Sequence, residues 1–280
     1  MTNVVGAQTK NDYNLLVHKK DLNIKSFDAA NVDSISFFEI PPFNTGDDFT
    51  IEEKEITSSS VKIDFIPKDK NLTYYACITH QDGFDRAWDE YGSLYNMDKD
   101  YWVWMGQIYN KDWLEVLKTQ ALKGDYSLDG NEDYGFILWD EVYYAYCFGL
   151  DEQGEMNTPL YLKKYKTPVP VKSDNTLLVE SIVPGDNGAV KIKVNASNND
   201  QYYVAAQKKS YVDFYVNSLG SVEAMFKYTI SRIDPGMYLH KGSEEIELYC
   251  ATPNTDYVLI VCGYDGGPTT EIQLRDFRTQ

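Results

Sequence analysis

Short runs of β-branched and aromatic residues recur along the chain, separated by polar turns, and such runs predict β-strands. Before residue 47, strands are expected at Tyr13–Lys20, Ile24–Phe27 and Asn31–Phe38. Further strands are expected at Phe49–Ile56, Val61–Ile66, Tyr74–Ile78, Tyr143–Gly149 and Pro159–Tyr165, and then again from Leu177–Ile182 to Phe277. Many short strands at close spacing are typical of antiparallel sandwiches.

Two segments between these strands carry helical signals instead. Asp112 and Glu115 resemble a capping box, with Leu114 and Leu117 on one face and Gly124 as the expected stop. In the later segment Ser221 is the expected cap and residues 234–236 the expected end. Its apolar stripe comprises Val222, Met225, Phe226, Thr229, Ile230 and Ile233. Such stripes favour packing of each helix against its own sheet.

The same series of short motifs occurs twice along the chain in the same order, which indicates a tandem duplication. The matches are Val61-Lys62-Ile63 with Val190-Lys191-Ile192, Tyr74-Tyr75 with Tyr202-Tyr203, Gly124-x-Tyr126-x-x-x-Gly130 with Gly236-x-Tyr238-x-x-x-Gly242, Tyr143 through Asp151 with Tyr257 through Asp265, and Tyr165-Lys166-Thr167 with Phe277-Arg278-Thr279. We therefore predict a mainly β protein with a β-rich segment (1–47), a first copy (48–168) and a second copy (169–280). Each copy is a β-sandwich with a helical insertion, and a proline-containing linker joins them.

Composition and charge narrow the function classes. The chain is 43% hydrophobic, enough to fill real cores, and its net charge of −17 argues against nucleic acid or an anionic membrane surface as partner. No apolar run approaches the roughly 18 residues of a membrane span, and no signal peptide is visible at the start. The four cysteines do not recur between the copies, which favours free buried thiols over an essential disulfide. A Cys77–Cys147 bridge stays open if their strands are neighbours.

The segment Thr252-Pro253-Asn254-Thr255-Asp256-Tyr257 resembles the P-x-T-x-Y corner of fibronectin type III domains, whereas the first copy retains only Tyr143 of it. The pair of copies is similar to tandem fibronectin-like domains of cell-surface lipoproteins from gut Bacteroidetes. That resemblance implies an extracellular, outer-membrane surface location, a lipid anchor outside this chain, and a role in adhesion or glycan capture.

The chemistry-bearing residues do not form a catalytic set. His18, His80 and His240 lie in separate segments, and no nucleophile motif is present. Asp85, Asp89 and Glu90 could form a carboxylate pair for glycoside hydrolysis, although any acidic loop would supply as much. We therefore expect no enzyme activity. A calcium loop remains open at Asp129, Asn131, Asp133 and Asp140, with an ordinary polar turn as the alternative.

Aromatic residues are the strongest functional lead. All five tryptophans lie in the first copy, and the second copy repeats the plan without one, so the fold does not demand indoles. Flat aromatic faces suit sugar rings, and neighbouring carboxylates accept hydroxyl hydrogen bonds. The expected ligand site comprises Trp88, Tyr91, Tyr101, Trp102 and Trp104, with Asp85 and Asp89 as polar partners. Trp102 and Trp104 share a face if this piece is a strand. The alternative is that these residues form a small core of the insertion.

These observations predict the class of protein and not a specific ligand. We expect a non-catalytic surface binding or adhesion protein whose partner is a polysaccharide, a host or cell-surface glycan, or a protein. The second copy would then be a spacer. The alternatives are a structural or pilus-like assembly subunit and, less consistent with the residues, a hydrolase.

Overall fold

The structure, a computed structural model, describes residues 14–18, 24–28, 43–133, 135 and 137–280. Internal contacts separate the chain into Met1–Pro42 and Phe43–Gln280. In the first unit, β1 (Asn14–His18) pairs antiparallel with β2 (Ile24–Asp28), as the pattern predicts. The strand expected at Asn31–Phe38 lies outside the described residues.

The first copy contains two antiparallel sheets. One sheet has the order β3-β4-β6 and the other β5-β7-β8. Their strands are β3 (Phe49–Ile56), β4 (Val61–Pro67), β5 (Tyr74–His80), β6 (Tyr126–Asp129), β7 (Val142–Gly149) and β8 (Tyr161–Lys166). Residues of β4 alternate between core and surface, so Val61, Ile63 and Phe65 are fully buried between the sheets.

The second copy repeats this arrangement. One sheet has the order β13-β10-β9 and the other β12-β11-β14-β15. Their strands are β9 (Leu177–Pro184), β10 (Ala189–Ala196), β11 (Gln201–Lys208), β12 (Leu239–Lys241), β13 (Glu244–Tyr249), β14 (Asp256–Gly263) and β15 (Gln273–Arg278). Short 3-10 turns occur at η2 (Asp186–Gly188) and η3 (Pro235–Tyr238). This strand order is that of a fibronectin type III-like sandwich, so the chain carries two such sandwiches in tandem, each with a helical insertion.

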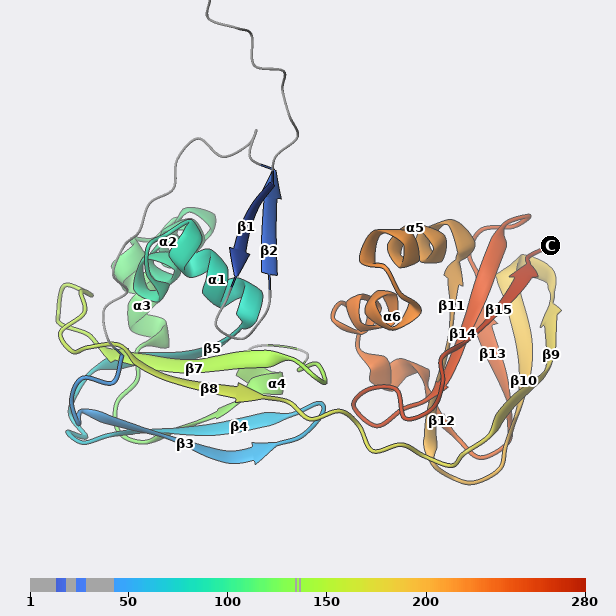
Figure 1. Ribbon diagram of the computed structural model, residues 1–280, viewed down its shortest axis with the longest axis horizontal. Helices are drawn as coiled ribbons and strands as arrows, with labels where there is room; N and C mark the ends of the chain where they lie inside the picture. Colours follow the sequence, from blue (N-terminus) through green and yellow to red (C-terminus); the bar gives the residue numbers. More distant parts are fainter. Residues whose placement is uncertain (1–13, 19–23, 29–42, 134, 136) are drawn as a thin grey trace, which may run out of the picture. The chain divides into compact units, whose positions relative to one another are not determined.

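Helices cover the outer face of one sheet in each copy (Figure 1). The first copy contributes α1 (Gln81–Asp89), α2 (Leu94–Tyr109) and α3 (Trp113–Gln120), and the second contributes α5 (Lys209–Leu219) and α6 (Val222–Ile230). The short α4 (Gly130–Asp133) lies instead against β4 and β6 of the other sheet. Because the sheets beneath the other helices are covered on both faces, their central strands are buried almost without alternation, with β7 buried throughout Tyr143–Gly149.

The predicted caps are confirmed, but both predicted helix ends are wrong, since α6 ends at Ile230 and not at residues 234–236. Asp112 accepts a hydrogen bond from the Leu114 N–H, and Ser221 accepts one from the Ala224 N–H. Helix α3 ends at Gln120 and not at Gly124, because the backbone of Leu122 turns away to pair with Tyr74. The sequence pattern predicted neither α1 nor α2.

The repeat also needs one correction, at Gly124. The hydroxyl of Tyr74 donates to the Gly124 carbonyl, and the hydroxyl of Tyr202 donates to the Gly242 carbonyl, each at 2.9 Å. Both glycines have positive φ and precede the strand that pairs with β4 or β10. The structural counterpart of Gly124 is therefore Gly242, and the predicted match of Gly124 with Gly236 is wrong.

Both copies contain the tyrosine corner. The Leu138 N–H donates to the Tyr143 hydroxyl at 2.9 Å, and the Thr252 N–H donates to the Tyr257 hydroxyl at 3.4 Å. In the first copy the sequence retains only Tyr143 of the corner motif. The structure shows that this tyrosine makes the corner hydrogen bond without the P-x-T pattern.

All four cysteines are free thiols. Strands β5 and β7 are neighbours, yet Cys77 pairs directly with Tyr146 and Cys147 is the next residue along. Because successive side chains of a strand point to opposite faces, Cys77 lies under the helices and Cys147 lies between the sheets. The Cys77–Cys147 bridge is therefore not formed.

One side chain of the first copy packs within the second. Trp139 is 1% exposed and lies 6.0 Å from Phe226, ring centroid to ring centroid. Its indole N–H reaches Glu223 at 3.4 Å, and Lys227 pairs with Glu141 at 2.9 Å beside it. A side chain at Gly267 would meet the indole at 2.6 Å, so the close contact depends on glycine. The linker is therefore supplemented by direct packing.

Candidate functional site

Helix α2 separates the two tryptophans that the sequence analysis grouped. An α-helix turns about 100° per residue, so residues 102 and 104 point to opposite sides, and the shared strand face expected for them is wrong. Trp102 is fully buried, with its ring edge-on to Tyr75 at 5.0 Å and its indole N–H bonded to Gln120 at 2.9 Å. It belongs to the core beneath the helix and has no surface to offer a ligand.

Tyr101 and Trp104 lie on the surface side of α2. They are 43% and 53% exposed, and their ring centroids are 6.0 Å apart. Large aromatic side chains exposed as an adjacent pair are uncommon where no partner covers them. Tyr101 and Trp104 are thus an exposed aromatic pair, and the ligand platform expected around them stays a prediction.

The remaining predicted residues divide between two places. Trp88 is 9% exposed and packs against Phe43 and Phe84, while Asp85 accepts a hydrogen bond from Gln81 on its own helix. Asp89 is exposed at the end of α1. Tyr91, in contrast, lies with Tyr101 and Trp104 on one cavity, which Trp88, Asp85 and Asp89 do not line.

That cavity, which we call the α2 pocket, has a volume of about 810 Å³ and lies between the helices and strand β5. Its lining includes Tyr75, Cys77, Arg86, Tyr91, Asp98, Asp100, Tyr101, Trp104, Gln120, Tyr126 and Tyr146. Aromatic walls with a few polar groups are typical of small-molecule sites. Arg86 is the one basic residue among the described residues that line it.

Asp98 is a buried carboxyl group in the wall of this pocket. It is 7% exposed, and the Tyr146 hydroxyl lies 3.0 Å from each of its carboxylate oxygens. Burial raises the pKa of Asp98 well above its usual range, and the Tyr146 hydrogen bond offsets part of that rise. Burial also raises the pKa of the neighbouring Cys77 thiol to about 12. The sequence analysis missed Asp98, although it continues the stripe of Tyr95 and Trp102 at helical spacing.

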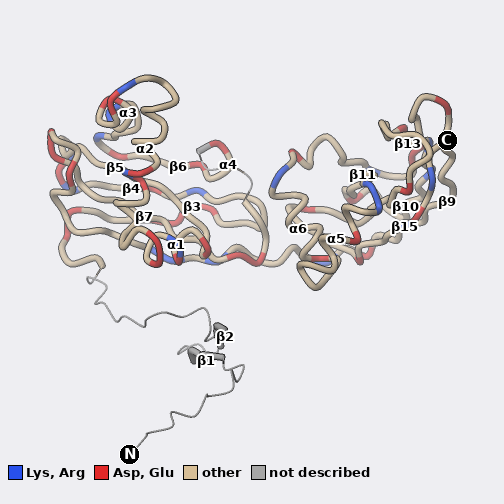
Figure 2. The backbone as a smooth tube through the Cα atoms, turned by 90° about the horizontal axis from the view of Figure 1, so that it is seen from above, with Lys and Arg blue, Asp and Glu red and all other residues tan. Residues whose placement is uncertain are grey.

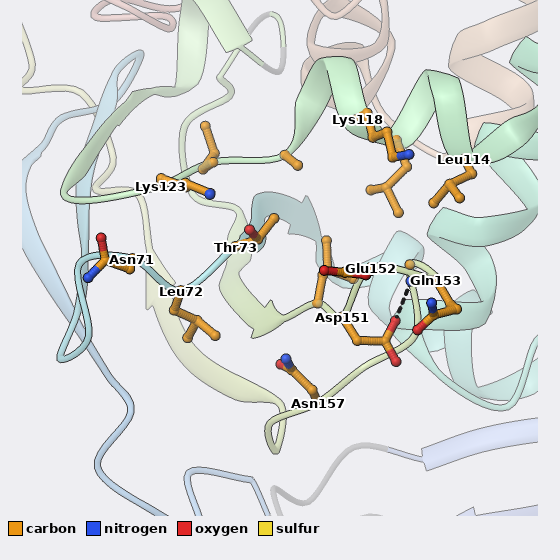
Figure 3. A pocket seen from close by; sticks show the side chains of 15 residues that line it. Asn71, Leu72, Thr73, Leu114, Lys118, Lys123, Asp151, Glu152, Gln153 and Asn157 are labelled. Atoms are coloured by element: carbon orange, nitrogen blue, oxygen red, sulfur yellow. Dashed lines mark hydrogen bonds between the residues drawn. The ribbon is translucent and has the colours of Figure 1, made fainter.

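A second cavity, the α3 groove, lies beside helix α3 and has a volume of about 910 Å³. Figure 3 shows Asn71, Lys123 and Asp151 around it, with Lys118 on α3 above. Asp151 accepts hydrogen bonds from the N–H groups of Gln153 and Glu155 at 2.9 Å, which fixes the turn at the groove's edge.

The second copy has the corresponding cavity, about 350 Å³ in volume, lined by Asn199, Lys241 and Asp265. These are the repeat counterparts of Asn71, Lys123 and Asp151 when Gly124 is matched with Gly242. Here the linker runs along the edge, with the Ser173 N–H bonded to the Thr269 carbonyl at 3.0 Å. The first copy's groove is therefore the roomier version of a hollow built into the repeated frame.

Three of the four candidate calcium residues have protein partners. Asp129 accepts a hydrogen bond from the Asn131 N–H, the Asn131 amide donates to the Ser59 carbonyl, and Asp140 forms an ion pair with Lys166. Among the described residues, no three acidic, histidine or cysteine side chains gather as a metal site. Calcium at Asp129, Asn131, Asp133 and Asp140 stays a prediction.

Figure 2 shows acidic and basic residues interspersed along residues 43–280. No helix in the described parts of the chain is long and apolar enough to cross a membrane.

Among the comparisons with known proteins, only the one with solved structures finds similarity. No family model and no curated protein sequence matches the chain. A two-domain fibronectin type III segment of chicken tenascin matches at 10% identity with a TM-score of 0.25, over 82% of this chain and 98% of that one. The central fibronectin-III array of RIM-binding protein matches at 12% identity with a TM-score of 0.21, over 82% of this chain and 67% of that one. At scores this low, the fold assignment rests on the strand order and the two tyrosine corners.

Proposed function

We propose that this protein is a non-catalytic binding module that captures carbohydrate on the insertion of its first copy. The observation that carries the proposal is the exposed Tyr101–Trp104 pair at the α2 pocket. Aromatic faces stack on the C–H faces of sugar rings, and the neighbouring Arg86, Asp100 and Tyr91 offer donors and acceptors for hydroxyl groups. A polysaccharide or a surface glycan is the partner class that this chemistry suits.

The division of labour between the copies supports the same proposal. The second copy reproduces the frame with a smaller insertion and no tryptophan, so its role is that of a spacer. Display at a cell surface, through an anchor outside this chain, would let many copies act together, because stacking on a sugar is weak for each contact.

A glycan-array screen followed by single substitutions tests the proposal. Trp104→Ala and Tyr101→Ala should abolish or strongly weaken binding without lowering the melting temperature, since both side chains are largely exposed. Phe214→Ala is the matched control, because Phe214 is an exposed helical aromatic of the second copy. Equal binding by wild type and Trp104→Ala, or an equal loss in Phe214→Ala, would contradict the proposal.

Assembly is the competing function, and α2 supplies the observation that favours it. Val103, Ile108 and Tyr109 are also exposed on this helix and extend the apolar surface beyond the pocket. Concentration-dependent oligomers in light scattering, abolished by Ile108→Lys, would support assembly. A monomer retained on polysaccharide would support capture, whereas release of reducing sugar from the bound glycan would identify a hydrolase.

A further inference from the structure

We infer that the α2 pocket selects ligands that carry an amino group, with Asp98 as the residue that recognises it. The inference rests on the proposed function, since it names the class of glycan, an amino sugar with a free amine. Neither Asp98 nor its partner Tyr146 is among the ligand-site residues expected from the sequence.

The first argument is the hydrogen-bonding capacity that Asp98 leaves unused. A carboxylate accepts about four hydrogen bonds. Asp98 receives one hydroxyl group, that of Tyr146, shared between its two oxygens at 3.0 Å each. Among the described residues, no lysine, arginine or histidine nitrogen lies within the 4.0 Å of an ion pair with it. A buried carboxyl group without a cation is costly as an anion, so a site that exposes it to a cavity suits a ligand that brings the cation.

The second argument is the wall of the pocket. Tyr75, Tyr91, Tyr126 and Trp104 line it together with Tyr101 and Tyr146. Aromatic faces attract ammonium groups, more strongly when water is excluded. Neutral sugars also stack on aromatic faces, but they give no reason for a buried carboxyl group in the wall of the pocket.

The third argument is the charge of the side chains that line the pocket. Arg86 of α1 and Asp100 of α2 are the charged residues that line it besides Asp98. Burial raises the pKa of Tyr75 and Cys77 of β5 and of Tyr146 of β7, so these three groups are neutral at ordinary pH. With Asp98 ionised, the lining holds two carboxylates and one guanidinium, so it has one negative charge to offer an ammonium group.

Proton balance gives the binding a measurable signature. Burial raises the pKa of Asp98, so the empty pocket holds the carboxyl group largely protonated below that pKa. When an ammonium ligand binds, the carboxyl proton leaves to solvent and the ion pair forms. Affinity for the amine should then rise with pH, by at most tenfold per pH unit, until Asp98 ionises unaided or the amine loses its own proton. A neutral glycan should show no such slope.

The experiment compares the tetramer of glucosamine with the fully N-acetylated tetramer, by isothermal titration calorimetry between pH 5 and 8. Wild type should prefer the free amine by about tenfold or more, and it should release close to one proton at pH values where both the amine and the Asp98 carboxyl group are protonated before binding. Asp98→Asn should bring the ratio near one and leave the acetylated tetramer bound, because the asparagine oxygen still accepts from Tyr146. Asp89→Asn removes a carboxylate outside the pocket and should keep the preference for the free amine.

The outcomes separate this inference from the proposed function. Equal affinity of wild type for both tetramers, or a preference that survives Asp98→Asn, would overturn amine recognition. Such a result would leave glycan capture standing. Butylamine serves as the sugar-free probe: if it binds wild type but not Asp98→Asn while no glycan binds, amine recognition stands and glycan capture fails. If none of the three probes binds, amine recognition is overturned, and the glycan-array screen decides glycan capture.

Discussion

The two copies cover the same sheet face with different helices, and the difference shows which aromatic residues the fold requires. In the first copy Trp102 lies edge-on to Tyr75 at 5.0 Å, and in the second Phe226 lies edge-on to Tyr203 at 5.2 Å. Tyr75 and Tyr203 are repeat counterparts. A phenyl ring thus fills in one copy the core position that an indole fills in the other. Trp102 is therefore explained by packing of the fold. What the second copy lacks is the exposed Tyr101–Trp104 pair with its pocket and buried carboxyl group.

The largest effect should come from the side chains beneath the helices. Trp102→Ala and Phe226→Ala should each lower the free energy of unfolding by about 3–5 kcal/mol, because both rings are fully buried. Trp104→Ala should stay within about 0.5 kcal/mol of wild type. Denaturant unfolding measures all three. Equal costs for Trp102 and Trp104 would remove the distinction between core and platform.

A smaller effect is expected at the two tyrosine corners. Tyr143→Phe and Tyr257→Phe each remove one hydrogen bond to a backbone N–H and should cost about 1 kcal/mol. The first change should cost more, because the Tyr143 bond is 2.9 Å long and that of Tyr257 is 3.4 Å. The reverse order in the same unfolding assay would show that the P-x-T pattern, and not the bond length, sets the strength of the corner.

Calcium should give the smallest effect. If the ion binds at Asp129–Asp140, a calcium concentration equal to the dissociation constant stabilises the native state by about 0.4 kcal/mol. The melting temperature should rise slightly with added calcium, fall back with chelator, and lose the response in Asp129→Asn. A melting curve unchanged across millimolar calcium would dismiss the site.

Sequence reasoning predicted most of the strands because each copy acts as a check on the other, but it missed β6 (Tyr126–Asp129). Val61 and Val190, like Tyr74 and Tyr202, hold the same place in the frame, so their repetition reflects shared packing. The match of Gly124 with Gly236 was wrong because turn glycines recur at many spacings. The hydrogen bond from the tyrosine hydroxyl to the glycine carbonyl shows that Gly124 corresponds to Gly242. The sequence alone does not reveal this contact.

The structure brings together only part of the residue set that the sequence indicated. Tyr91, Tyr101 and Trp104 line one pocket, and ligand binding there stays a prediction. The shared face of Trp102 and Trp104 was wrong because helix α2 was not recognised. Ser93, which caps α2 by accepting from the Asn96 N–H, was the available signal. Once the helix is known, Asp98 is the polar residue on an otherwise apolar stripe, and its burial follows from its neighbours.

Trp139 has a consequence for how this chain would respond to tension. With its indole inserted beside Phe226, a pull applied to the two ends must extract that ring before the linker can straighten. The joint should therefore yield as a separate early event in a single-molecule stretching trace, ahead of either sandwich. Cutting the chain between the copies would leave an indole on one fragment and an uncovered apolar surface on the other, so the copies prepared singly should be more prone to aggregate than the pair.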